Sequence, residues 1–239
     1  MRGVILFFSL RFRRIAMAAV SVCSALFFGA SADQAVGAIV YDNGAADPSG
    51  GNESTLWLQA NDFTLGSTTN LTGASFFIAG FGGIGNWDGT LEYLLFADSG
   101  NSPGTLITNG NGNNIVTTDT FVGWLGGGNI HQVDFEFATP FAAAAGTKYW
   151  LGLHLAADYS TMDFIYWVIT SPTLANGGGN ALESDGGTMN NWLGQGKEHA
   201  FYLNGTPAGG AVPEPTSLAI FGLGAVGAAY RARRRLVAG

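Results

Sequence analysis

Three carboxylates are the side chains that come closest to hydrolytic chemistry. A glycosidase cleaves its bond between two acids, one that donates a proton and one that acts as base or nucleophile. Glu92, Asp134 and Glu136 lie on expected strands, and Asp134 and Glu136 share one face because side chains alternate along a strand. Acids on the polar face of an edge strand are typical of a solvated surface, so we predict no catalytic residue and no enzyme. The alternative is a secreted glycan-active hydrolase whose carboxylate pair is unidentified.

Two further patterns that suggest catalysis lack a necessary part. Residues 100–104, Gly-Asn-Ser-Pro-Gly, match the G-x-S-x-G turn that carries a nucleophilic serine. That turn uses the backbone N–H after the serine as an oxyanion donor, and Pro103 has none. We therefore predict a hairpin turn. The histidines lack the spacing of a zinc site; they are His131, His154 and His199.

Binding has more support in the sequence than catalysis. Aromatic rings can stack on sugar rings, and one end of a tryptophan or histidine ring can also form hydrogen bonds. The residues that could form such a platform are Trp87, Trp150, His154 and Trp192. Trp150 and His154 share one face of an expected strand, opposite a row of leucines. Burial in the core is the alternative role for each tryptophan.

A glycine-rich stretch near the start of the mature chain carries three carboxylates, Asp42, Asp47 and Glu53. Carboxylate and carbonyl oxygens are the ligands that Ca²⁺ takes in proteins. The alternative is an ordinary cluster of turn residues. We predict no cofactor, with Ca²⁺ as the one candidate ion.

The chain between its two ends is strongly acidic. Residues 33–212 contain 16 acids and two cations, Lys148 and Lys197, which gives a net charge of −14, against −7 for the whole chain. A domain with this charge repels phosphate backbones, which excludes nucleic-acid binding. The only cysteine, Cys23, lies in the N-terminal apolar stretch, so no disulfide framework is available.

Short apolar and aromatic runs, separated by Gly, Asn, Asp, Ser and Pro, predict the fold. Val133, Phe135 and Phe137 alternate with acids, as expected of a half-buried strand. Such runs without an amphipathic helix predict an all-β, antiparallel β-sandwich, jelly-roll-like, over residues 33–204, with a linker at 205–211. The expected strands are Ala38–Tyr41, Thr55–Leu58, Leu71–Ala79, Thr90–Ala97, Ile115–Thr118, Phe121–Leu125, Ile130–Ala138, Thr147–Leu155, Asp163–Thr170 and Ala200–Leu203.

The N-terminus has the layout of a secretory signal peptide. Arginines precede an apolar run at residues 15–28, and small residues follow it. We predict that signal peptidase cleaves between Ala32 and Asp33, which removes residues 1–32. Cleavage after Ala38 and a retained membrane anchor are the alternatives.

The C-terminus combines an apolar segment with a basic end. A helix over residues 216–230 would be about 22 Å long, short of the roughly 30 Å of a bilayer core. We therefore predict a short transmembrane helix that is inserted transiently into the inner membrane. Basic residues stay cytoplasmic, which places the acidic domain outside. They are Arg231, Arg233, Arg234 and Arg235.

The last 28 residues, 212–239, resemble the PEP-CTERM sorting signal of Gram-negative bacteria. The motif Pro213, Glu214, Pro215 is followed by the glycine-rich apolar run and the arginines, in that order. The resemblance implies recognition by an exosortase, removal of the tail near this motif, and delivery to the cell surface or outside. It also implies an association with extracellular polysaccharide and biofilm.

The body is similar, more loosely, to β-sandwich domains of PEP-CTERM proteins, over residues 90–104 and 145–153. Together these features predict an exported, exosortase-processed surface or matrix protein of structural or binding type, with weak glycan contact as its candidate activity.

Overall fold

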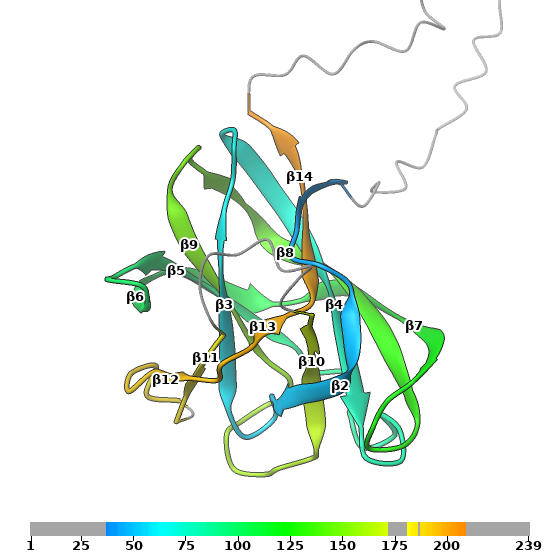
Figure 1. Cartoon of the computed structure of the whole chain (residues 1–239). Coiled ribbons are helices and arrows are strands. Elements are labelled where there is room, and N and C mark those ends of the chain that lie inside the picture. Colours follow the sequence, from blue (N-terminus) through cyan, green and yellow to red (C-terminus); the bar gives the residue numbers. More distant parts are fainter. Residues whose placement is uncertain (1–36, 172–180, 186, 209–239) are drawn as a thin grey trace, which may run out of the picture. The chain divides into compact units, whose positions relative to one another are not determined.

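The computed structural model describes residues 37–171, 181–185 and 187–208 (Figure 1). The predicted signal peptide, sorting motif and transmembrane helix lie outside these described residues. Within them the chain forms strands only, so no helix there could cross a membrane. The strands are β1 (Ala38–Asp42), β2 (Ala46–Glu53), β3 (Leu58–Thr64), β4 (Thr69–Gly80), β5 (Glu92–Asp98), β6 (Pro103–Asn111), β7 (Asn113–Gly123), β8 (Asn129–Ala143), β9 (Lys148–His154), β10 (Ile165–Thr170), β11 (Leu182–Ser184), β12 (Leu193–Gly194), β13 (Glu198–His199) and β14 (Phe201–Pro207).

The first sheet is organised around β4. β14 pairs with β4 from Thr69 to Phe76, and β10 continues along the same side of β4 from Ile78 to Gly80. β8 pairs with the other side of β4, and β7 lies outside β8. β1 pairs with β14, while β2 and β13 pair with β10. Every pair is antiparallel, and β4 has partners along both of its sides.

The second sheet has the order β12-β11-β3-β9-β5-β6, also antiparallel. β5 and β6 form a hairpin in which Asp98 is opposite Pro103, and the N–H of Ser99 donates to the carbonyl of Ser102 at 2.8 Å. The hairpin turn predicted for residues 100–104 is thus confirmed.

The core lies between the two sheets. Tyr93 of β5 stacks on Phe137 of β8 with ring centroids 4.5 Å apart, which joins the sheets face to face. Phe76 of β4 is fully buried and meets Phe135 edge-on at 5.9 Å. The inward face predicted for Val133, Phe135 and Phe137 is confirmed, and so is the all-β antiparallel fold. The jelly-roll assignment stays a prediction.

A second apolar layer covers the outer face of the second sheet. Leu58, Ala60, Leu94, Phe96 and Trp150 are buried there. The residues packed over them come mostly from segments after β9 and after β10, and are Leu106, Tyr159, Leu182, Met189 and Trp192. Burial on both faces removes the alternation of apolar and polar residues by which a half-exposed strand is recognised.

The predicted strand Thr55–Leu58 is wrong. Residues 55–57 form a bend, and the strands on either side of it, β2 and β3, were not predicted. β2 reads Ala-Asp-Pro-Ser-Gly-Gly-Asn-Glu, a composition typical of a turn, and it pairs on one side with β10. β3 carries Asn61 and Asp62 at buried positions, where polar residues are rare unless they are paired.

β14 continues to Pro207, into the stretch that the sequence assigns to a linker. Gly205 lies within it, and a Cβ atom there would approach the carbonyl oxygen of Asn70 to 2.5 Å. The glycine therefore permits close strand pairing with β4. A glycine in a polar stretch is found both in linkers and where two strands approach closely. The sequence alone therefore does not distinguish a linker from the end of β14.

Candidate functional site

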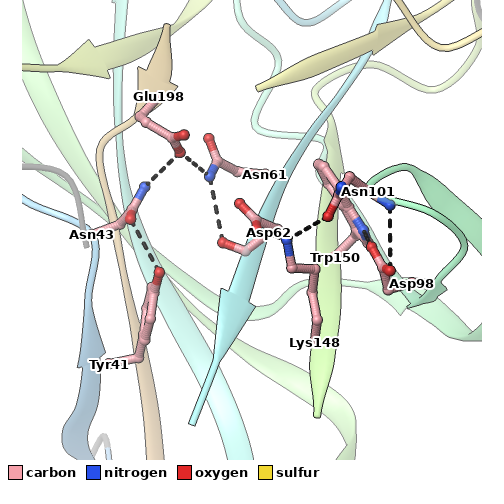
Figure 2. Close-up of polar contacts among 9 residues, drawn as sticks. All are labelled: Tyr41, Asn43, Asn61, Asp62, Asp98, Asn101, Lys148, Trp150 and Glu198. Carbon is pink, nitrogen blue, oxygen red and sulfur yellow. Dashed lines mark hydrogen bonds and ion pairs between the residues drawn. The ribbon is translucent and has the colours of Figure 1, made fainter. Parts of the chain in front are cut away.

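Trp150 and His154 are buried, which removes them from any sugar-binding surface. Trp150 is 1% exposed, and its indole N–H donates to Asp98 Oδ1 at 2.9 Å (Figure 2). His154 is also 1% exposed; its ring stacks on Tyr159 at 3.7 Å and its Nε2 lies 2.8 Å from the carbonyl oxygen of Thr55. Burial lowers the pKa of His154, which keeps the imidazole neutral.

Trp87 and Trp192 are half-buried and lie in different parts of the fold. Trp87 follows β4, packs against the main core and donates from Nε1 to the carbonyl of Thr90 at 2.9 Å. Trp192 packs edge-on to Phe96 at 5.7 Å in the outer apolar layer. The structure therefore does not bring Trp87, Trp150, His154 and Trp192 together as one exposed platform.

Each candidate calcium ligand is hydrogen-bonded within its own turn. Asp42 Oδ1 accepts from the N–H of Gly44 at 2.7 Å, and Asp47 Oδ1 accepts from that of Ser49 at 2.9 Å. Glu53 accepts from the backbone of the following bend, including the N–H of Leu56 at 2.8 Å. Among residues 37–171, 181–185 and 187–208, no three His, Cys, Asp or Glu side chains are placed to hold a metal. Calcium binding stays a prediction.

The acids considered for hydrolysis lie on strand surfaces. Glu92, on β5 of the second sheet, accepts from Asn109 at 2.8 Å. Asp134 and Glu136 lie on β8 of the first sheet. Glu136 accepts from Asn114 at 2.8 Å, and Asp134 accepts from its neighbour Gln132 at 2.9 Å. Glu92 and the pair on β8 thus belong to different sheets.

A buried carboxylate that the sequence did not suggest is Glu198, on β13. It is 8% exposed and accepts from the amide nitrogens of Asn61, at 2.6 Å, and Asn43, at 3.4 Å (Figure 2). The hydroxyl of Tyr41 donates to the oxygen of that Asn43 amide at 3.1 Å. Burial raises the pKa of Glu198. Its partners join β1, β3 and β13, so the cluster ties strands of the two sheets together.

Asp62 of β3 is the second buried acid of this region. Its Oδ2 lies 2.9 Å from the Nζ of Lys148 on β9, and Lys148 also donates to Asn101 Oδ1 at 3.1 Å (Figure 2). Asp62 is 1% exposed. Both buried acids are thus held by partners within the fold.

Four aromatic rings, two of them exposed, gather at the end of the first sheet where β4 and β7 finish and β10 begins. The rings of Phe81 and Tyr166 are perpendicular at 5.4 Å, Phe81 and Trp124 lie 5.4 Å apart, and Trp124 and Tyr166 lie 5.1 Å apart. Phe164 meets Phe81 edge-on at 6.4 Å. Phe81 is 57% and Phe164 46% exposed. We call these four residues the aromatic end.

Strand pairing and a glycine loop position the aromatic end. Phe81 directly follows β4 and Phe164 directly precedes β10, where Gly80 is paired with Ile165. Trp124 is buried beneath them and donates from Nε1 to the carbonyl of Gly50 at 3.3 Å.

A loop of glycines then passes over the tryptophan ring. Gly126 carries no side chain there, because a Cβ atom would lie 2.2 Å from that ring. Its carbonyl accepts from the N–H of Gly82 at 3.3 Å, which links this loop to the one after β4.

Phe164, and Phe121 of β7, have a left-handed backbone conformation, with φ of 61° and 58°. This conformation costs a bulky L-residue roughly 1–2 kcal/mol. Both side chains are exposed, Phe121 to 84%. Strain of this kind persists where surrounding structure enforces it, and it gathers at functional sites.

The sequence could have indicated the aromatic end by one signal. Phe81 is a large aromatic residue two positions beyond the expected strand Leu71–Ala79, and Phe164 is the second residue of the expected strand Asp163–Thr170, so both lie close to expected strand ends. Sequence reasoning concentrated on tryptophan and so missed them.

Comparison with known families identifies the C-terminal segment. A family described as the PEP-CTERM protein-sorting motif matches residues 211–235, which confirms the resemblance predicted for the C-terminus. Searches of curated proteins and of solved structures found no match. The chain therefore carries a PEP-CTERM sorting motif, which implies export and processing by an exosortase, with the cell surface or the exterior as destination.

Proposed function

We propose that this exported, exosortase-processed chain is a non-catalytic surface or matrix protein that binds neutral polysaccharide through its aromatic end. The observation that carries this proposal is the group of partly exposed rings formed by Phe81, Phe164 and Tyr166 over the buried Trp124. Rings of this kind offer flat apolar surface at a low entropic cost, and the C–H face of a sugar is the matching surface.

The chemistry around the rings suits hydroxyl groups. Burial, followed by the charge of Glu53, raises the pKa of Tyr166, so its hydroxyl stays protonated and can donate to a sugar oxygen. The neighbouring loops at residues 81–86 and 125–129 contain glycine and asparagine and no charged residue. The net charge of −14 over residues 33–212 disfavours anionic polymers, which leaves neutral ones.

The position of the aromatic end also supports a role in binding. The chain leaves the sandwich towards its sorting motif after β14, where Pro207 is paired with Thr69 at the start of β4 (Figure 1). Phe81 follows the last residue of the same strand. The 12 residues of β4 separate the two places by about 35–40 Å, at roughly 3.3 Å per residue. The rings therefore lie at the end of β4 opposite the point of attachment.

The test is binding of the processed protein to a panel of neutral polysaccharides, with Phe81→Ser, Phe164→Asn and the double variant. We expect each substitution to weaken binding by about 1–2 kcal/mol and the double variant by at least tenfold. Phe164→Asn should fold with an unchanged or higher Tm, because asparagine tolerates positive φ better than phenylalanine does.

The matched control is Ile107→Ser, which removes an apolar side chain 45% exposed on β6 of the other sheet. It should leave binding unchanged. Absence of binding by the unmodified protein, or equal effects of Phe81→Ser and Ile107→Ser, contradicts the proposed function.

A further inference from the structure

The place where the chain leaves the sandwich is built from turns that carry no charge. The carbonyl of Thr68, in the turn between β3 and β4, accepts from the N–H of Ala208 at 2.8 Å. The turn between β8 and β9 joins it, since Gly146 donates to the carbonyl of Leu65 at 2.9 Å. β1 begins beside them, with Ala38 paired to Gly205. We call residues 37–40, 64–68, 138–147 and 205–208 the exit end.

None of these residues is charged, although residues 33–212 contain 16 acids. The charged residues that border these ranges in the chain are Asp42, Asp62, Glu136 and Lys148. Lys148 neutralises Asp62 at 2.9 Å, and Asp98 accepts from the indole of Trp150. The exit end itself therefore carries no carboxylate, and Asp62 at its border is paired with a cation.

The sequence limits how far the exit end can be from the membrane before processing. Seven residues, 209–215, separate Ala208 from the apolar segment that begins at Thr216. At about 3.3–3.6 Å per residue they span at most about 25 Å, whatever their conformation. With residues 216–230 inserted, the folded sandwich is held close to the lipid headgroups, at its uncharged end.

We propose that the exit end lies against the anionic lipid surface until the sorting motif is cleaved, and that its lack of charge permits this approach. The inference rests on the proposed processing by an exosortase. Negative headgroups repel carboxylates within a Debye length, about 8 Å at physiological salt. An acidic exit end would push the domain outward against a short tether and draw the motif away from the membrane-embedded protease.

The test adds two carboxylates to exposed positions of the exit end, as Ser67→Asp with Thr147→Glu. The matched uncharged variant is Ser67→Asn with Thr147→Gln. A second control, Asn86→Asp with Thr161→Glu, adds the same charge to exposed loops beyond the other end of β4. The full chain is placed in vesicles of zwitterionic lipid, with and without an anionic phospholipid, and its cleavage by exosortase is timed.

We expect the charged exit-end variant to be cleaved more slowly in anionic vesicles, by about fivefold for each added carboxylate close to the surface. The rate should be normal in zwitterionic vesicles and for both control variants. Equal slowing by the charged and uncharged exit-end variants, or slowing that does not depend on anionic lipid, would indicate contact with the protease and overturn the proposal. So would normal cleavage of all variants. Failure of the unmodified chain to be cleaved would count against the proposed processing itself.

Discussion

At the scale of single residues, the most unusual group is the imidazole of His199. It is fully buried, stacks on Trp167 at 4.3 Å, and its Nε2 lies 3.1 Å from Asn52 Oδ1. Burial lowers its pKa from 6.5 to about 3. The folded protein therefore holds this histidine neutral at pH values where the unfolded chain is protonated.

This difference predicts a loss of stability in acid. As pH falls from about 6.5 towards 3, the unfolded state takes up a proton at His199 that the folded state refuses, so the free energy of unfolding falls by about 1.4 kcal/mol per pH unit. The raised pKa of Glu198 has the opposite effect, since it makes the folded state relatively more stable as pH falls. His199→Gln leaves Glu198 in place, so this contribution is common to the variant and the unmodified protein. His199→Gln should therefore show a flatter decline of stability between pH 7 and pH 5 than the unmodified protein.

The measurement is urea denaturation at several pH values. His131→Gln, on the outer face of β8, is the control and should keep the steeper decline. An identical pH dependence for His199→Gln and the unmodified protein would show that burial of His199 does not control acid stability.

Residue roles were harder to predict than the fold. Trp150 and His154 lie on a strand face that also carries Lys148, so the face looks solvent-exposed in the sequence. In the structure, Tyr159 stacks over His154, and Trp192 belongs to the layer over Trp150. That cover comes from segments whose position along the chain does not reveal where they pack.

At the scale of elements, Lys148 joins three parts of the second sheet. It lies on β9, pairs with Asp62 of β3, and donates to Asn101 in the turn between β5 and β6. Removal of the lysine would leave the carboxylate of Asp62 buried and without its counter-ion, which is costly.

Lys148→Met should therefore lower the free energy of unfolding by about 2 kcal/mol, a value reduced from that of a fully buried pair because the lysine is partly exposed. Adding Asp62→Asn should recover part of the loss, since position 62 then no longer carries a carboxylate without its counter-ion. Lys197→Met removes an exposed lysine and should change stability by less than about 0.5 kcal/mol. Urea denaturation at neutral pH distinguishes these cases. Equal effects of Lys148→Met and Lys197→Met would be incompatible with a structural role of the ion pair.

The strands that the sequence predicted correctly have a simple pattern. β4, β8, β9 and β10 are long apolar runs, or alternate cleanly, and they form the centre of the two sheets. β2 and β3 were missed because their polar residues are satisfied by contacts with distant segments, such as Asn61 with Glu198 and Asn52 with Gln195. The order of polar and apolar residues along a single strand does not reveal contacts with such distant segments.

At the scale of the whole molecule, the described sandwich has two different ends. The exit end is uncharged and leads to the sorting motif, while the aromatic end carries exposed rings at the far end of β4. Composition indicated the acidity and the all-β fold, and the C-terminal residues indicated the sorting class. The separation of the two ends follows only from strand pairing.

The central claim is that the Pro-Glu-Pro motif is the point at which the exported protein is processed. The measurement is the intact mass of the exported protein from cells that carry the unmodified chain or one with Pro213, Glu214 and Pro215 replaced by alanine. Gly210→Ala, outside the matched motif, is the control. We predict that the unmodified and control proteins lose the C-terminal tail near this motif, while the triple variant keeps it and stays with the membrane fraction. The same mature mass for the triple variant and the unmodified protein would contradict the account.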